Sequence, residues 1–230
     1  MGQGREDLPE HSRLNQITFI STTHKENGNC NANELCNIIE RLAPEVIFLE
    51  ALKETYSDYE QYLFSQYGVF HKKLEIEALQ KYCYKSSFEY VLVLNDGLSE
   101  AFDKKYEIAT QNVELQRKIE NFNTLSAKYG FRFLNSDVSI QLQEDMRKLE
   151  SSILNNSILN KDAINSIASY EDEMLGNIYS YCKTNHFSKA VFMCWVAHRK
   201  SVIGKVEKFN TDNEIAIDWP VLRFETTALF

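Results

Sequence analysis

Short runs of apolar and β-branched residues alternate with longer amphipathic stretches along this chain. The four clearest runs span residues 17–20, 46–49, 90–94 and 190–196. Each has the length and composition of a buried strand. Apolar residues at helical spacing follow the first run and end near Pro44, which predicts a helix capped by Asn31 or Asn33. Strand, helix and strand in this order predict a βαβ unit with parallel strands and a right-handed crossover.

The rest of the pattern is mainly helical. Helices are predicted over residues 52–67, 73–86, 98–128, 140–154, 160–184 and 199–208, a short strand over 131–134, and a late strand within 215–224. The fold class is therefore α/β, with a mainly parallel central sheet, flanking helices and a helical insertion over about 98–184. We expect a polar lead over residues 1–16 and a single domain over 17–230.

Composition and charge narrow the classes of function. The chain has 230 residues, 43% of them hydrophobic, and a formal net charge of −8. An acidic surface disfavours nonspecific binding to phosphate backbones, so no nucleic-acid partner is expected. No apolar run is long enough to span a membrane, and the polar first residues do not resemble a secretory signal. The five cysteines form no CxxC pair, which predicts reduced thiols in a cytoplasmic protein.

Polar side chains follow the predicted strands at the points where the strands end. His24 comes after the first strand, Glu50 ends the second, Asp96 follows the third, and His198 follows the run over 190–196. The carboxyl ends of parallel strands meet at one edge of a sheet, where ligands commonly bind. Imidazole and carboxylate groups are ligands for divalent metals and general acids or bases near neutral pH. The sequence therefore predicts one shared polar site.

Each of these residues also has an ordinary structural interpretation. A histidine after a strand is often a loop residue, Glu50 can pair with Lys53, and Asp96 lies in an Asn-Asp-Gly turn. Only their joint placement favours a site. The chain has no GxGxxG, GxxxxGKS, HExxH or GxSxG string, which argues against the common nucleotide-binding, zincin and serine-hydrolase motifs.

The order of short motifs resembles the TraB/PrgY-like family, which is related to the Tiki and GumN proteins. In the first half of the chain, Ser-Thr-Thr-His at 21–24 is similar to the family's G-T-x-H, and Ile-Phe-Leu-Glu at 47–50 is similar to its V-x-V-E. Glu-Ile-Glu-Ala at 75–78 is similar to E-x-x-A, and Leu-Asn-Asp at 94–96 is similar to a strand ending in I-D. In the second half, residues 170–174 are similar to R-D/N-x-x-M, and Trp-Val-Ala-His at 195–198 is similar to G-x-x-H. The chain departs from the family as a divergent member would. Ser21 and Trp195 replace glycines that allow close backbone approach to a ligand, and the family's arginine falls on Tyr170.

The resemblance implies a metal-dependent hydrolase, and together with the strand-end pattern it leads to the hypothesis of a metallopeptidase-like enzyme acting on a peptide or amide bond. His24 and His198 would bind a divalent metal (Mn, Zn or Co), with Glu50 as a further ligand or general base. The remaining candidates have lesser roles. Glu75 and Glu171 are further catalytic carboxylates. Arg199 and Lys200 would hold an anionic group of a peptide or small-molecule substrate. Ser21 and Asp96 would lie on the substrate side, and Asp96 would also orient a histidine.

Two alternatives stay open at this point. The missing glycines and the unusual Trp195 are typical of a catalytically inactive relative that binds a signalling peptide or a partner protein. A phosphodiesterase or nuclease could use the same residue types, although the acidic charge disfavours it. Whether the chain forms a homo-oligomer is open as well.

Overall fold

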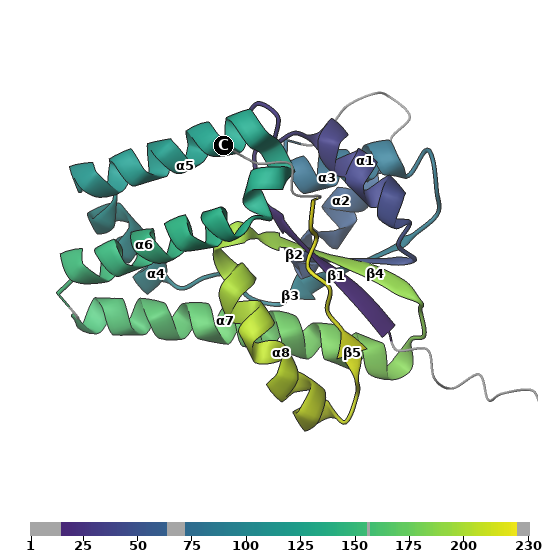
Figure 1. The fold of residues 1–230 in the computed structure, drawn as a ribbon. Helices are drawn as coiled ribbons and strands as arrows, with labels where there is room; N and C mark the ends of the chain where they lie inside the picture. Colours follow the sequence, from purple (N-terminus) through teal and green to yellow (C-terminus); the bar gives the residue numbers. More distant parts are fainter. Residues whose placement is uncertain (1–14, 64–71, 156, 225–230) are drawn as a thin grey trace, which may run out of the picture.

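A five-stranded, all-parallel sheet forms the centre of the molecule (Figure 1). The structure is a computed structural model and describes residues 15–63, 72–155 and 157–224. The strands are β1 (Asn15–Thr22), β2 (Val46–Leu52), β3 (Glu89–Leu94), β4 (Lys189–Trp195) and β5 (Ile217–Asp218). Their order across the sheet is β3-β2-β4-β1-β5. The predicted α/β class with a parallel sheet is confirmed, and the carboxyl ends of β1, β2, β3 and β4 lie at one edge.

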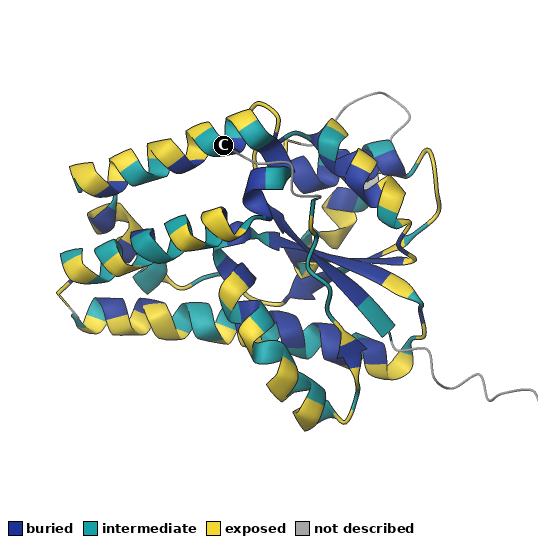
Figure 2. Cartoon of the chain, viewed as in Figure 1, coloured by how far each residue is buried: buried dark blue, intermediate teal, exposed yellow. Residues whose placement is uncertain are grey.

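Helices cover both faces of this sheet. The helices are α1 (Ala32–Leu42), α2 (Tyr56–Leu63), α3 (Leu74–Tyr82), α4 (Glu100–Ala109), α5 (Val113–Leu134), α6 (Asp137–Ile153), α7 (Ile158–Thr184) and α8 (Arg199–Asn213). Apolar residues of α1, α3 and the end of α5 pack on one face, and those of α7 and α8 pack on the other. Figure 2 shows the resulting buried layer on either side of the strands.

The first βαβ unit forms as the sequence predicts. Asn31 is the cap of α1, because its side chain accepts a hydrogen bond from the backbone N–H of Glu34 at 3.0 Å. Leu35, Ile38 and Ile39 are buried on the sheet, as the helical spacing of apolar residues requires. The helix ends with Ala43 in the left-handed region just before Pro44.

Four expectations about the remaining elements were wrong in part. The segment over 98–128 is two helices, α4 and α5, and residues 131–134, expected as a strand, form the last turn of α5. The backbone changes direction there at Gly130, whose φ of 57° lies in the region that glycine tolerates best. The late strand is reduced to the two residues of β5.

Leu52 still belongs to β2 and residues 53–55 form a 3₁₀ turn, so the helix expected over 52–67 begins at Tyr56. The end of that expected helix and most of the polar lead lie outside the described residues.

The helices of the insertion project beyond the carboxyl edge of the sheet (Figure 1). In this region α4 packs on α7, and α5 packs on α6. Asn135, just after α5, joins it to the sheet: its side-chain oxygen accepts the N–H of Ser21 at 2.8 Å, and its amide nitrogen donates to the carbonyl of Ser21 at 3.2 Å. The insertion is therefore fixed to the end of β1 by a pair of buried hydrogen bonds.

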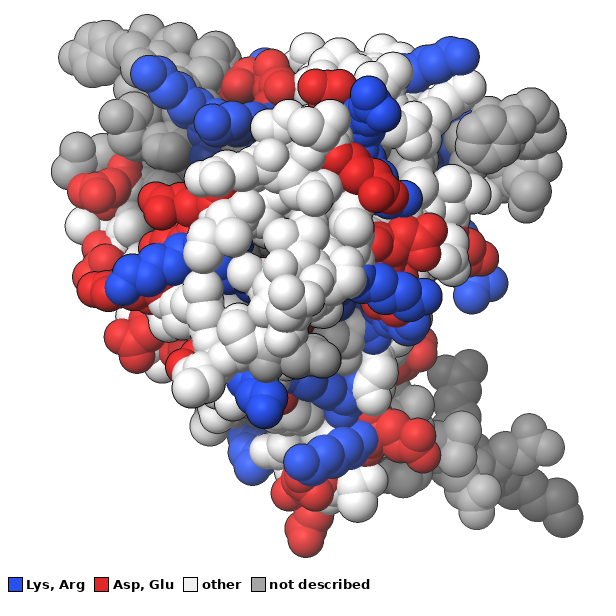
Figure 3. Space-filling view, turned by 90° about the vertical axis from the view of Figure 1, so that its left-hand side faces the viewer, with Lys and Arg blue, Asp and Glu red and all other residues white. Residues whose placement is uncertain are grey.

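The surface at the far end of this helical region is mixed in charge. Figure 3 shows acidic and basic side chains dispersed around an uncharged central area. Among the described residues, no helix is long and apolar enough to span a membrane.

Candidate functional site

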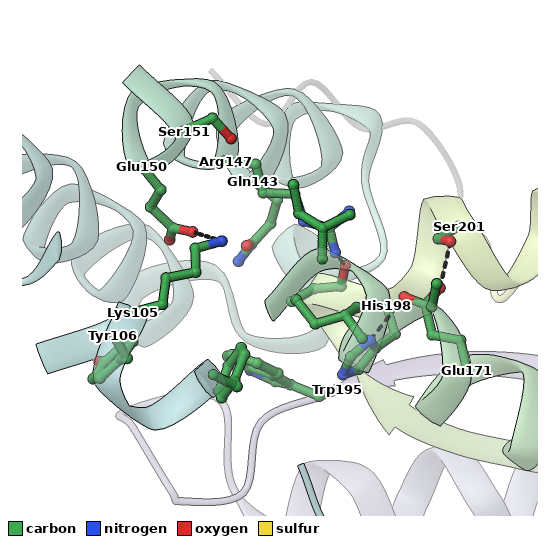
Figure 4. Close-up of a pocket in the computed structure, with 15 residues that line it drawn as sticks. Lys105, Tyr106, Gln143, Arg147, Glu150, Ser151, Glu171, Trp195, His198 and Ser201 are labelled. Atoms are coloured by element: carbon green, nitrogen blue, oxygen red, sulfur yellow. Dashed lines mark hydrogen bonds and ion pairs between the residues drawn. The ribbon is translucent and has the colours of Figure 1, made fainter. Parts of the chain in front are cut away.

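A cavity of about 290 Å³ lies where the helical insertion meets the carboxyl edge of the sheet (Figure 4). Its walls come from α4, α6 and α7, from the end of β4, and from the turn and the start of α8 that follow it. Trp195, Ala197 and His198 line its inner end. The insertion therefore encloses space over the edge of the sheet where the sequence predicted a site.

Glu50 ends the regular part of β2 and is held in the interior. The register of β2 shifts against β3 between Leu49 and Leu52, and such a bulge re-aims the side chains within it. One carboxylate oxygen of Glu50 accepts the backbone N–H of Trp195 at 2.5 Å, and the other accepts the hydroxyl of Tyr170 at 3.0 Å. These donors compensate for removing a carboxylate from water.

His198 lies between two carboxylates in the 3₁₀ turn that follows β4. Its Nδ1 is 2.9 Å from Glu171 Oε1, and its Nε2 is 3.6 Å from Glu50 Oε1. Nε2 is buried and has no hydrogen-bond partner among the described residues. When Nδ1–H donates to Glu171, the neutral ring presents its Nε2 lone pair toward Glu50.

Glu171 on α7 is the orienting partner of His198 (Figure 4). Its second oxygen accepts hydrogen bonds from the hydroxyl of Ser201 and, at 3.1 Å, from the ammonium group of Lys205. Burial raises the pKa of Glu171, but the hydrogen bonds from His198 and Ser201 and the contact with Lys205 offset this, and its pKa is lowered overall. Glu171 is therefore ionised at neutral pH and can hold the Nδ1 proton of His198.

A second histidine–carboxylate pair joins the end of β1 to α3. His24 Nδ1 is 3.3 Å from Glu75 Oε1, which also accepts the hydroxyl of Thr22 at 2.7 Å. Burial raises the pKa of Glu75, but the hydrogen bond from His24 and the charge of Lys73 lower it overall. The other oxygen of Glu75 is buried without a hydrogen-bond partner among the described residues.

The indole ring of Trp195 neighbours both histidines. Its ring centre is 6.2 Å from that of His24 and 5.7 Å from that of His198. Trp195 occupies the position at which the family resemblance expects glycine. In the described structure His198 contacts Glu50 and Glu171, whereas His24 contacts Glu75.

Four further predicted site residues lie elsewhere. Ser21 is buried at the end of β1, where its backbone bonds to Asn135. Asp96 is exposed after β3. Arg199 is buried with a guanidinium nitrogen 3.4 Å from the carbonyl of Ser136, and Lys200 is an exposed partner of Glu144.

The sequence interpretation missed two cationic side chains that line the cavity, and the carboxylate that pairs with one of them. Arg147 on α6 donates a hydrogen bond to the carbonyl oxygen of Ala197, and Lys105 on α4 forms a 3.0 Å ion pair with Glu150 on α6. Both lie within polar amphipathic helices, where charged residues usually face solvent. Only the packing of the insertion against the sheet reveals that they face a cavity.

Metal binding and thiol chemistry can be compared with this geometry. Within residues 15–63, 72–155 and 157–224 no group of three or more His, Cys, Asp or Glu side chains surrounds one point. The described centre offers two adjacent donors, His198 Nε2 and Glu50 Oε1. Burial and the nearby charge of Glu50 raise the pKa of Cys194 well above its usual value, so that this thiol is protonated at neutral pH and poorly nucleophilic.

Comparisons with known proteins add no relative: no family model, no curated protein and no solved structure matches this chain.

Proposed function

We propose that this protein is a hydrolase of peptide or amide bonds that depends on a divalent metal, with His198, Glu50 and Glu171 at its centre. The observation that carries the proposal is the environment of His198. Its Nδ1 is bound by an ionised carboxylate, while its buried Nε2 lacks a hydrogen-bond partner among the described residues and faces a second carboxylate at 3.6 Å.

The two facing donors fit a divalent ion. With metal–ligand bonds of about 2.0–2.2 Å and tetrahedral angles, two ligands of one zinc ion lie about 3.4 Å apart. The separation of Nε2 and Oε1 is close to this value. A nitrogen and a carboxylate oxygen suit zinc, cobalt or manganese. His198 and Glu50 would hold such an ion, which would polarise the carbonyl of the scissile bond.

The surrounding residues would keep these donors in place. Glu171 fixes the ring orientation and the tautomer of His198, as carboxylate partners of metal-binding histidines do. Tyr170 and the N–H of Trp195 restrict the carboxylate of Glu50. Ser201 and Lys205 do the same for Glu171.

The family resemblance supports the same class of activity through His24 and Glu75. In this proposal the half-exposed His24, oriented by Glu75, transfers protons at the solvent side of Trp195. The cysteines described are free thiols, four of them buried, which supports a cytoplasmic location as part of the proposal.

Metal analysis combined with activity tests the proposal. Purified protein is loaded with zinc, manganese or cobalt, dialysed, and analysed for bound metal and for cleavage of a peptide library. We expect about one bound ion and detectable cleavage in the natural chain, with both lost in His198→Ala and in Glu50→Gln. His186→Ala is the matched control, because His186 is exposed and outside the site. Undiminished metal content in both site variants would overturn the metal centre.

A second candidate function is peptide binding without catalysis. The observation in its favour is that His198 Nε2 and the Glu50 carboxylate are buried beneath Trp195 and Tyr170, so that a substrate in the cavity reaches only the rim of the pair. A metal-loaded protein that cleaves nothing in the library, yet retains peptides on an affinity column, would establish this function in place of hydrolysis.

A further inference from the structure

The cavity beside His198 is small and partly open to solvent, and three helices, α4, α6 and α7, form most of its wall. Its volume of about 290 Å³ is just below the range of about 300–1,000 Å³ that is typical of small-molecule sites. A space of this size takes a group of about one amino-acid residue, not a long polypeptide segment. The cavity therefore selects for the end of a chain or for a small amide.

Most of the wall is apolar and partly aromatic. This surface comes from Phe102 and Tyr106 of α4, from Ile164 and Ile167 of α7, and from Trp195 at the end of β4. Burial of an apolar or aromatic side chain against these residues is favourable. The wall thus indicates an apolar group on the ligand.

The charges around the cavity leave one cation poorly compensated. Lys105 is paired with Glu150 at 3.0 Å, and Glu171 is paired with Lys205 at 3.1 Å. Arg147, in contrast, has its described acidic neighbour Glu144 at 4.0 Å.

That neighbour is itself engaged elsewhere, because Glu144 forms a shorter ion pair of 2.8 Å with Lys200. A ligand with a single negative charge would balance the guanidinium of Arg147.

Arg147 is also placed next to the proposed reaction centre. It donates to the carbonyl oxygen of Ala197, the residue before His198 (Figure 4). A guanidinium group has five N–H donors, so Arg147 can keep this bond and still bind a carboxylate. An anion held there would lie beside the residue that precedes His198 in the chain.

We propose that the cavity binds the terminal residue of the substrate, with its free α-carboxylate on Arg147 and its apolar or aromatic side chain against α4 and α7. This rests on the proposed function and names its substrate class: peptides with an apolar C-terminal residue, or N-acyl derivatives of such amino acids. Hydrolysis adds water across the amide C–N bond. The acyl carbon gains the hydroxyl, the nitrogen gains the proton, and the free amino acid leaves.

Binding of two matched probes tests the substrate class separately from catalysis. N-acetyl-L-phenylalanine carries the free carboxylate, and N-acetyl-L-phenylalaninamide lacks it. Isothermal titration calorimetry on the metal-loaded full chain is expected to show tighter binding of the acid by about tenfold to a hundredfold, the usual effect of a charge-assisted hydrogen bond.

The variant Arg147→Gln should remove this preference and leave binding of the amide unchanged, which also reports that the variant is folded. Lys148→Gln is the matched control: it makes the same change in charge at the next, exposed position of α6 and should keep the preference. Ala168→Phe, which fills the cavity from α7, should abolish binding of both probes.

The outcomes separate this inference from the proposed hydrolase activity. Arg147-dependent binding of the acid without any cleavage supports the ligand class and overturns the hydrolase. Cleavage that is equally fast for peptides with a free and an amidated C-terminus overturns the ligand class and leaves the hydrolase intact. Equal binding of both probes, or binding that Ala168→Phe does not change, overturns the ligand class.

Discussion

Two histidine–carboxylate pairs stand at the same edge of the sheet and differ mainly in their contact with water. In both, a histidine that follows a strand meets a glutamate carried by a helix. The pair of His198 and Glu171 is 2.9 Å apart with side chains 3% and 1% exposed. The pair of His24 and Glu75 is 3.3 Å apart, and the histidine is 43% exposed.

The difference indicates a division of roles. Charges and hydrogen bonds interact more strongly where water is excluded, so the buried pair can hold a fixed geometry. The half-exposed pair exchanges protons with solvent more readily. The comparison predicts that stability depends mostly on the buried pair, whereas solvent-linked proton transfer depends on the exposed pair.

Removing one histidine from each pair gives the largest expected contrast. His198→Ala should lower the free energy of unfolding by about 3 kcal/mol, because it leaves two buried carboxylates facing each other without the ring. His24→Ala should lower it by about 1 kcal/mol, because water can replace part of the lost interaction. Urea denaturation at pH 7 measures both. Equal losses would show that burial does not distinguish the pairs.

The glutamates should make stability depend on acid pH. The pKa values of Glu171 and Glu75 are lowered in the folded chain, so each contributes stability above the unfolded value of about 4.3. That contribution is lost as pH falls through the folded pKa. In urea titrations from pH 7 to pH 2, Glu171→Gln and Glu75→Gln should each flatten the decline. A decline as steep as in the natural chain would contradict the assignment.

Tyr170→Phe tests the carboxylate that faces the buried pair, Glu50, and leaves the exposed pair untouched. The hydroxyl of Tyr170 holds Glu50, and its removal should lower the free energy of unfolding by about 1 kcal/mol. Affinity for the loaded metal should fall about tenfold, since residues that hold ligand side chains have this effect. Metal titration and urea denaturation measure the two effects. His186→Ala, at an exposed position outside the site, is the control and should change neither.

The smallest effect is expected at the surface. Lys200 pairs with Glu144 outside the cavity and is 60% exposed, so Lys200→Ala should change the free energy of unfolding by less than about 0.5 kcal/mol. Lys205→Ala should cost more, because Lys205 contacts the buried Glu171. Thermal unfolding of the two variants ranks them. The reverse order would mean that burial of the acidic partner is not the deciding factor.

Sequence patterns predicted the sheet well, because short runs of apolar and β-branched residues specify buried strands locally. They failed at residues 131–134, where a strand-like composition is buried as helix by packing after the turn at Gly130. Local pattern was overruled by tertiary contacts.

The residues of the candidate site that lie at the ends of strands could be predicted from the sequence. Glu50 and His198 could be assigned to one edge, and the structure brings them within 3.6 Å. Arg147 could not be found, because nothing local distinguishes it from a solvent-facing helical residue. The pairing of Glu171 with His198, like that of Glu75 with His24, depends on how a helix packs against the sheet. The local sequence around each glutamate does not show it.

The two hydrogen bonds between Asn135 and Ser21 fix the start of α6 relative to the sheet. They tie the junction of α5 and α6 to the end of β1. Further along α6, the bond from Arg147 to Ala197 and the ion pair of Glu144 with Lys200 hold the helix against the segment after β4. Arg147 follows the first residue of α6, Asp137, by ten positions, a distance of about 15 Å along the helix axis. A tilt of about 5° would therefore displace it by about 1.3 Å. The distance from the guanidinium of Arg147 to His198 is thus sensitive to the angle of α6.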